Sequence, residues 1–384
     1  MSKCFTWLGV QLAVLVIAGM GCQLDGGGAM AGSSDSVFHG APSGSASTVM
    51  LYALDPSPGV GSYRDEGVIP FLIATAVVVG PHHAISVAHV TPAFDAVNDV
   101  EVFLADAPEF EKGTFQGEEY LLITNHDESR RVGYWMSFSE SLQAIPAGST
   151  SVALSQDTMP GDDLMVLVLQ DDQRAFAGQQ IAALRRPQDG DPSPPAGAAQ
   201  CGFIGVGFGW PNHHKRQYNA CFVSPDEPQD DATPKPLYMV YPNNSGFATP
   251  PSVHHNGAAC EGDSGGPVYD GQSRVIGLYS GSLDPECSFP ADPNHLEIVT
   301  NTALAPNWSA IERVRRLCRP SDTAAECQKL IDEPSCGNLG AIAGFEETDL
   351  QCLPAGTPKP GDTGVVIKGA TDCEVCVGMQ WLGD

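Results

Sequence analysis

Basic residues are scarce in this sequence. Lys and Arg make up only 19 of its 384 residues, against 46 Asp and Glu, and the formal net charge is −27. Such an acidic chain repels a phosphate backbone, so nucleic acid is not expected among its partners. A solvated acidic surface is the ordinary explanation of the excess, and it requires no special acidic function.

Long amphipathic helical patterns are also scarce, and no internal repeat is evident. Pro and Gly are plentiful instead, at 31 and 42 residues. This combination favours an all-β protein. A chain of this length can hold two modules that each have a core.

The amino terminus is predicted to be a targeting segment. Lys3 precedes an apolar run from Phe5 to Met20, which is too short for a stable membrane span. We therefore expect residues 1–22 to be a signal peptide and residues 23–36, rich in Gly and Ser, to be a flexible tether.

Two processing sites compete in this segment. Gly19-Met20-Gly21-Cys22 resembles a bacterial lipobox, which would make Cys22 the lipidated residue and anchor the protein to the cell envelope. Ala29-Met30-Ala31 has the small-x-small form of ordinary signal cleavage, which would release a secreted protein.

The most informative segment reads Cys-Glu-Gly-Asp-Ser-Gly-Gly-Pro over residues 260–267. Its glycines allow positive φ and close approach of a ligand to the backbone around Ser264. A hydroxyl beside backbone N–H groups suits acyl transfer, in which an oxyanion hole holds the developing charge. A simple Gly/Ser turn would explain neither Cys260 nor Asp263.

A base and its orienting carboxylate are present in fitting contexts. Ala84–His89 is an apolar strand that ends in small residues and a histidine, and Asp163 directly precedes the apolar run Leu164–Leu169. Taken singly, His89 is explained as a core histidine and Asp163 as a strand cap, and Asp162 is a rival for the carboxylate. The order His, Asp, Ser is one in which catalytic triads occur.

These motifs resemble those of the chymotrypsin/trypsin family. Ser86–His89 is similar to that family's Thr-Ala-Ala-His, Asp163–Leu167 is similar to Asp-Ile-Ala-Leu-Leu, and Gly262–Pro267 is identical to its nucleophile motif. Similar strands and a helix start occur at Cys201–Gly207, Val275–Gly281 and Asn307–Ile311, so that the resemblance covers roughly residues 37 to 318.

The resemblance implies two antiparallel six-stranded β-barrels with a cleft between them and a C-terminal helix. Residues 37–185 would form the first barrel, with His89 and Asp163, and residues 198–318 the second, with Ser264. Arg186 to Gln200, rich in Pro, Gly and Ala, fits the connector. Residues 319–384 would form a cysteine-rich extension.

The resemblance also implies a role for each site residue. Ser264 would be the nucleophile, His89 the general base and acid, and Asp163 the group that fixes the tautomer of His89. The backbone N–H groups of Gly262 and Ser264 would form the oxyanion hole, and Ser280 would hydrogen-bond to Asp163.

The same comparison implies a specificity pocket that does not suit a basic side chain. Its floor would be Ala258, where a trypsin-like enzyme carries aspartate. Ser280 and Gly281 would contact substrate, and Asn294 would narrow the opposite wall. Small or medium apolar side chains are therefore expected before the cleaved bond, because a cation buried without a partner is costly.

Activation is predicted to follow cleavage before Val37. Val37-Phe38-His39-Gly40 resembles the family's Ile-Val-Gly-Gly start, whose freed amino group pairs with the aspartate before the nucleophile, here Asp263. The alternative is that residues 33–40 are only the end of the tether.

Most of the 12 cysteines are expected in disulfides. The resemblance implies that Cys260 and Cys287 brace the pocket. Cys201 and Cys221 would link adjacent strands, since Asp270 replaces the family's usual partner of Cys201. The family's bridge beside the histidine is replaced by two apolar residues, Ala74 and Val90. Six further cysteines lie in the last part of the chain: Cys318, Cys327, Cys336, Cys352, Cys373 and Cys376.

No metal ion or organic cofactor is expected. Cys373-x-x-Cys376 is a weak zinc or redox signal in an exported tail. The His-His pairs at 82–83, 213–214 and 254–255 are expected to be solvated in loops. The stretches around Glu111–Gly113 and Asn125–Asp127 are expected to be long loops near the cleft.

The sequence therefore predicts a serine endopeptidase that acts on proteins or peptides. The first alternative is a catalytically silent binding protein with a protease fold, which would normally lack a triad residue. The second is an esterase or acyltransferase, which the Gly-Asp-Ser-Gly-Gly context disfavours because it is not a nucleophile elbow.

Overall fold

The computed structural model describes the chain in separate stretches. They are residues 41–54, 63–64, 67–68, 70–91, 99–115, 118–138, 163–195, 198–209, 213–224, 236–240, 259, 262–282, 297–332, 351–353, 365–366 and 375–377. The predicted signal peptide and tether, with Cys22 and Val37, lie outside them. So does most of the extension 319–384.

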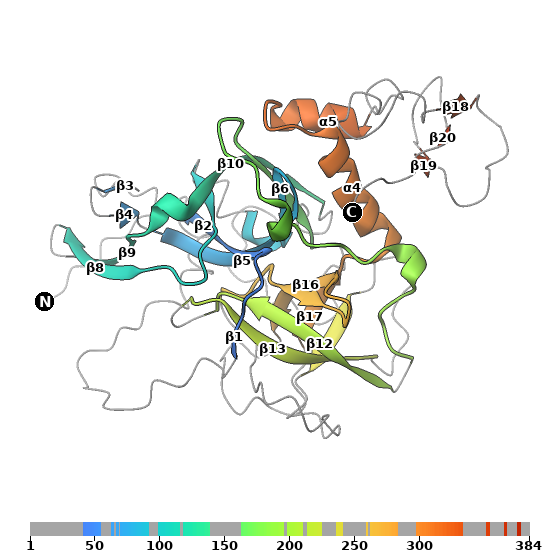
Figure 1. Ribbon diagram of the computed structural model, residues 1–384, viewed down its shortest axis with the longest axis horizontal. Coiled ribbons are helices and arrows are strands. Elements are labelled where there is room, and N and C mark those ends of the chain that lie inside the picture. The colour runs from blue at the N-terminus through green and yellow to red at the C-terminus, as the bar shows by residue number, and fades with distance from the viewer. Residues whose placement is uncertain are drawn as a thin grey trace, which may run out of the picture.

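The first half of the described chain forms a closed six-stranded barrel (Figure 1). In spatial order its strands are β10 (Ser129–Ser137), β11 (Met165–Leu169), β6 (His83–Ser86), β5 (Pro70–Gly80), β2 (Thr48–Leu54) and β7 (Val100–Phe103). Every residue of β2, β6, β7 and β11 is buried. Their apolar and β-branched side chains suit a pleated, packed surface, and burial of each large one contributes about 1.5–3 kcal/mol.

The second barrel follows the same plan. Its strands, in spatial order, are β13 (Arg216–Val223), β12 (Ala199–Gly207), β15 (Pro267–Tyr269), β16 (Val275–Ser282), β17 (Glu297–Asn301) and β14 (Leu237–Val240). Pairing of β13 with β14 closes it, and β1 (Ala41–Pro42) adds to β13 from outside. The predicted architecture of two antiparallel six-stranded barrels is confirmed.

An additional four-stranded sheet projects from the first barrel (Figure 1). It consists of β3 (Tyr63–Arg64), β4 (Gly67–Val68), β9 (Glu118–Ile123) and β8 (Phe110–Phe115). The expectation of long loops here is wrong for Glu111–Gly113, which lies within β8. The 3-10 helix η2 (His126–Glu128) follows β9 and includes two of the residues of Asn125–Asp127.

Cysteine pairing agrees with the barrel geometry. Cys201 and Cys221 are cross-strand partners on β12 and β13, and a disulfide joins them. Ala74 and Val90, which replace the family's bridge beside the histidine, are both buried in the apolar core of the first barrel. Their burial shows how the barrel is packed without that bridge.

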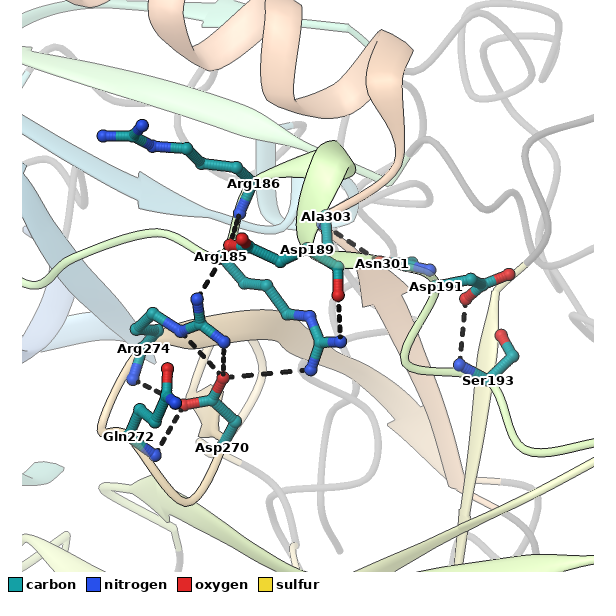
Figure 2. Close-up of polar contacts among 10 residues, drawn as sticks. All are labelled: Arg185, Arg186, Asp189, Asp191, Ser193, Asp270, Gln272, Arg274, Asn301 and Ala303. Atoms are coloured by element: carbon teal, nitrogen blue, oxygen red, sulfur yellow. Dashed lines mark hydrogen bonds and ion pairs between the residues drawn. The ribbon is translucent and has the colours of Figure 1, made fainter. Parts of the chain in front are cut away.

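The connector between the barrels is fixed by an ionic network on the second barrel (Figure 2). Arg274, in the turn between β15 and β16, binds the Asp270 carboxylate through Nε at 3.0 Å and Nη2 at 2.8 Å. Its Nη1 reaches Asp189 of η4 (Pro187–Asp189) at 2.7 Å. Arg185 donates to the carbonyl oxygen of Asp189 at 3.0 Å. Asp270 therefore anchors the start of the connector through Arg274. The 3-10 helix η3 (Gly178–Gln180) precedes it.

Two helices follow the second barrel, α4 (Ala305–Leu317) and α5 (Ala324–Asp332). A disulfide between Cys318 and Cys327 joins their ends. The turn between them returns to the first barrel, because Tyr134 Oη of β10 donates to the carbonyl oxygen of Arg319 at 2.8 Å. Farther along, β18 (Gln351–Leu353), β20 (Val375–Val377) and β19 (Val365–Val366) form a small sheet.

The helix junction covers His83 of β6, so the expectation that this histidine is solvated is wrong. His83 is buried, and its Nε2 lies 3.2 Å from the carbonyl oxygen of Cys318. Its Nδ1 has no hydrogen-bond partner among the described residues. Burial, only partly offset by the bond to Cys318, lowers the pKa of His83 from 6.5 to about 4.

We expect stability to fall as the pH drops from 6.5 towards 4. Between these pH values the His83 side chain binds a proton in the unfolded chain but not in the folded one. The free energy of unfolding therefore falls by about 1.4 kcal/mol for each pH unit and by roughly 3 kcal/mol in total. The folded protein keeps this contribution above pH 6.5 and has lost it below pH 4. Denaturant unfolding of the wild type and of His83→Gln across this range measures it. A free energy of unfolding that falls no more steeply with pH in the wild type than in His83→Gln would contradict the assignment.

Among the described residues, no helix has the length and apolar character needed to cross a membrane.

Candidate active site

His89 is presented at the end of a fully buried strand. β6 ends at Ser86, and the 3-10 helix η1 (Ala88–Val90) follows, with its small and apolar residues Ala88 and Val90 buried. The His89 side chain is 22% exposed and is therefore the accessible member of this turn. Its backbone N–H donates to Asp163 Oδ1 at 2.9 Å, which ties the turn to the carboxylate.

Asp163 lies two residues before β11 and is buried. Its Oδ2 accepts a hydrogen bond from His89 Nδ1 at 2.8 Å and another from Ser280 Oγ of β16. Thr300 Oγ1 of β17 donates to its carbonyl oxygen at 3.0 Å. Burial alone would raise the pKa of this carboxyl, but His89 and the hydrogen bonds outweigh it and hold the pKa below its usual value. Asp163 is therefore ionised at neutral pH.

Ser264 completes the series from the second barrel. Its Oγ lies 3.2 Å from His89 Nε2. With His89 Nδ1–H donating to the Asp163 carboxylate, Nε2 carries the lone pair and accepts a hydrogen bond from the Ser264 hydroxyl, a tautomer inferred from these hydrogen bonds. In the sequence, Asp163 is 74 residues from His89 and Ser264 is 175 residues from it. Folding thus brings the three predicted residues together from distant segments.

The turn around Ser264 depends on two glycines. Gly262 and Gly265 have φ of +92° and +83°, a conformation that other residues rarely adopt. A Cβ on Gly265 would overlap Ser86 Oγ and the carbonyl oxygen of Thr75, both from the first barrel. The turn around Ser264 therefore packs directly on the strands that lead to His89.

Asp263, between Gly262 and Ser264, packs against the end of β12. It is buried, and a Cβ on Gly207 or on Gly209 would overlap its carboxylate. The end of β12 and the residues after it are thus shaped around this side chain. Asp263 has a partner of its own in the folded chain.

The predicted substrate-contacting residues are described only in part. Ser280 and Gly281 are adjacent residues of β16. Ser280 lies beside Asp163, to which its hydroxyl donates a hydrogen bond. Five other residues of the sequence analysis lie outside the described stretches: Asp162, Ala258, Cys260, Cys287 and Asn294. No cluster of three or more His, Cys, Asp or Glu side chains within the described stretches is arranged to hold a metal ion.

Sequence reasoning missed Thr75, which joins the two barrels at the turn around Ser264. Its N–H donates to the carbonyl oxygen of Ser264 and its hydroxyl to that of Gly262, both at 2.8 Å. The available signal was one polar residue in the otherwise apolar run from Phe71 to Gly80.

Two antiparallel barrels with this Ser-His-Asp arrangement between them define the two-barrel class of serine proteases. The family model described as Trypsin matches residues 59–306, well over half of the chain. The chain belongs to the trypsin family and is a serine-type endopeptidase, so its substrates are proteins or peptides. A trypsin-family domain with disulfides is typical of exported or extracellular proteins.

Among solved structures, the chain is similar to neuropsin, a serine protease expressed in the limbic system of mouse brain. The two share 16% identity, and the match has a TM-score of 0.40 and covers 72% of this chain and 96% of neuropsin. A comparison with curated proteins finds no match.

Proposed function

We propose that this endopeptidase cleaves peptide bonds through Ser264, His89 and Asp163. The observation that supports the proposal is the unbroken hydrogen-bonded series from Ser264 Oγ to His89 and on to buried Asp163. Ser264 Oγ attacks the scissile carbonyl carbon while His89 Nε2 takes its proton. His89 then gives that proton to the leaving amine, the C–N bond breaks, and an acyl-enzyme remains on Ser264.

Water completes the reaction. His89 Nε2 takes a proton from the attacking water, the ester bond to Ser264 breaks, and the proton returns to Ser264 Oγ. Asp163 stabilises the imidazolium in both halves. The N–H groups of Gly262 and Ser264 bind the developing oxyanion, at roughly 3–4 kcal/mol for each donor. This sequence of steps uses only side chains, backbone and water.

Labelling with an organophosphonate probe tests the proposal. The probe phosphonylates a serine only when a base and an oxyanion hole activate it, so we expect one label on the wild type and none on Ser264→Ala. A wild-type protein that is folded but takes up no label would favour the silent binding protein. A label retained by Ser264→Ala would move the nucleophile to another residue.

We further propose a preference for small or medium apolar side chains before the cleaved bond. The proposal rests on the family resemblance, which would place Ala258 at the pocket floor and Asn294 on its wall, with the pocket braced by a Cys260–Cys287 disulfide. A Lys or Arg side chain would there be buried without an anionic partner.

Profiling with a peptide library measures this preference. We expect Ala, Val and Leu to lead at the position before the cut and Lys and Arg to be cleaved at least about tenfold less well, since one unpaired buried charge costs several kcal/mol. A profile led by Lys or Arg would contradict the proposal. It would implicate Glu261 and Asp292, which lie near the expected pocket residues in the sequence.

Export and anchoring form a separate proposal. We propose that the signal peptide within residues 1–22 is cleaved before Cys22 and that, until activation, residues 23–36 tether the barrels (37–185 and 198–318) to lipidated Cys22. The extension 319–384 would follow them. One acyl chain anchors only marginally, whereas the several chains of a bacterial lipoprotein would hold the protein firmly.

Mass spectrometry of the mature amino terminus tests the anchor. We expect a diacylglycerol-modified and acylated Cys22 as the first residue of the protein before it is cleaved at Val37, and loss of membrane association in Cys22→Ala. An unmodified start at Gly32 would show ordinary cleavage and a freely secreted enzyme.

A further inference from the structure

Thr75 is a buried residue of the first barrel whose polar groups are directed at the nucleophile turn of the second. It lies on β5 and is 0% exposed. Its N–H donates to the carbonyl oxygen of Ser264 at 2.8 Å, and its Oγ1 donates to that of Gly262 at 2.8 Å. The same Oγ1 accepts the N–H of Phe208 at 3.0 Å. One residue thus holds three backbone groups of the other barrel.

The two carbonyl contacts bracket one of the two proposed oxyanion donors, the Ser264 N–H. The Ser264 N–H belongs to the peptide between Asp263 and Ser264, which lies between the two anchored carbonyl groups. Phe208 supports Gly262 from the other side, because a Cβ on Gly262 would lie 2.9 Å from the Phe208 carbonyl oxygen. His213 Nδ1 lies 2.9 Å from that same oxygen. The orientation of the turn therefore depends on groups that Thr75 connects.

Thr75 is itself fixed relative to the catalytic base. Ser86 Oγ donates to the Thr75 carbonyl oxygen at 2.7 Å, and Ser86 ends the strand that leads to His89. A Cβ on Gly265 would overlap the Ser86 hydroxyl and the Thr75 carbonyl oxygen, so the turn packs directly against both groups. The base and the nucleophile turn are thus held by one continuous hydrogen-bonded unit.

We propose that Thr75 is a positioning residue that sets the geometry of the oxyanion hole. This inference rests on the proposed roles of Gly262 and Ser264. Oxyanion donors act only when they lie about 2.7–3.1 Å from the developing charge, and a displacement of about 1 Å costs on the order of 10²-fold in rate. Without the hydroxyl, the Gly262 carbonyl and the Phe208 N–H are buried without their partner, and the turn shifts to satisfy them.

Paired substitutions isolate the hydroxyl. Thr75→Val keeps the shape and removes the hydroxyl, Thr75→Ser keeps the hydroxyl, and Thr75→Ala serves as a second removal should the valine variant not fold. Thr48→Val is the matched control, because Thr48 is equally buried and its Oγ1 lies 3.0 Å from Tyr269 Oη of the second barrel. It makes none of the contacts to residues 262–264 described above.

The full active protein is assayed with p-nitrophenyl acetate for kcat and KM, and with phenylboronic acid, whose tetrahedral adduct occupies the oxyanion hole, for Ki. For Thr75→Val we expect kcat to fall about 10- to 100-fold, Ki to rise by a similar factor, and KM to stay within about threefold. Thr75→Ser should stay within about threefold of the wild type in all three. Thr48→Val should keep kcat and Ki even though its thermal stability falls.

Two outcomes would overturn the inference. One is an unchanged kcat in a folded Thr75→Val or Thr75→Ala protein. The other is a loss in KM alone with Ki for phenylboronic acid unchanged, which indicates substrate binding rather than oxyanion geometry. Failure of the proposed function is recognised separately, since it would leave Ser264→Ala active on the same ester.

Discussion

Replacing Ser264 by alanine is expected to lower kcat by on the order of 10⁴–10⁶-fold while leaving the fold intact. The substitution removes the atom that forms the acyl-enzyme, and only oxyanion and binding contributions remain. Removal of His89 should cost about as much, and the double variant hardly more than either single one, because the residues act as a unit. Steady-state kinetics on a peptide from the library profile measures this.

Asp163→Asn separates geometry from charge in the same experiment. An asparagine keeps the shape but can donate to His89 Nδ1, which imposes the wrong tautomer, so kcat should fall on the order of 10⁴-fold. A near-normal rate would transfer the role to Asp162.

Ser47→Ala is the matched control for the Ser264 substitution, because the Ser47 hydroxyl bonds Tyr269 Oη at 2.9 Å and no triad residue. Peptidase activity retained by Ser264→Ala would contradict the assignment.

The local parts of the site could be predicted from the sequence because each has its own pattern. An apolar strand that ends in small residues and a histidine, a carboxylate before a buried strand, and a serine among glycines are all visible within ten residues. Their meeting at 2.8 and 3.2 Å follows once the two barrels form. The resemblance to a known family supplied the barrels, which composition alone gave only as an all-β class.

Long-range contacts could not be predicted in this way. Thr75 looks like an ordinary strand residue, because nothing in its neighbourhood specifies that β5 faces the turn at Gly262. His83 follows Pro81 and His82, a composition typical of exposed turns, yet the junction at Cys318 covers it from more than 200 positions away. In both cases the deciding neighbour comes from the other half of the chain.

The amino-terminal segment enters the structure close to Asp263. β1 pairs Pro42 with Arg216 on β13, and Arg216 in turn pairs with Gly207 on β12. Gly207 is packed against the Asp263 carboxylate. Two strand spacings amount to about 10 Å, and the five residue steps from Val37 to Pro42 can span up to about 17 Å. An amino group freed at Val37 is therefore within reach of Asp263.

Asp263→Asn is accordingly expected to lower kcat/KM by on the order of 10³-fold, the second large effect. The proposed activation pairs the new amino group of Val37 with the Asp263 carboxylate, and removing one partner of such a buried pair costs about 3–5 kcal/mol. Without it, the turn at Gly262 is no longer held in the geometry that binds the oxyanion. Asp270→Asn, the same change at another buried aspartate of this barrel, should keep full activity.

Amino-terminal sequencing of the active enzyme decides whether cleavage is the cause. We expect the active form to begin at Val37, and uncleaved protein to gain activity in step with the appearance of that terminus. The alternative is that residues 33–40 merely end the tether. A fully active protein that still carries residues before Val37 would establish it, because the amino group needed for the pair would then not exist. An Asp263→Asn enzyme that is as active as Asp270→Asn would rule out the ion pair by an independent route.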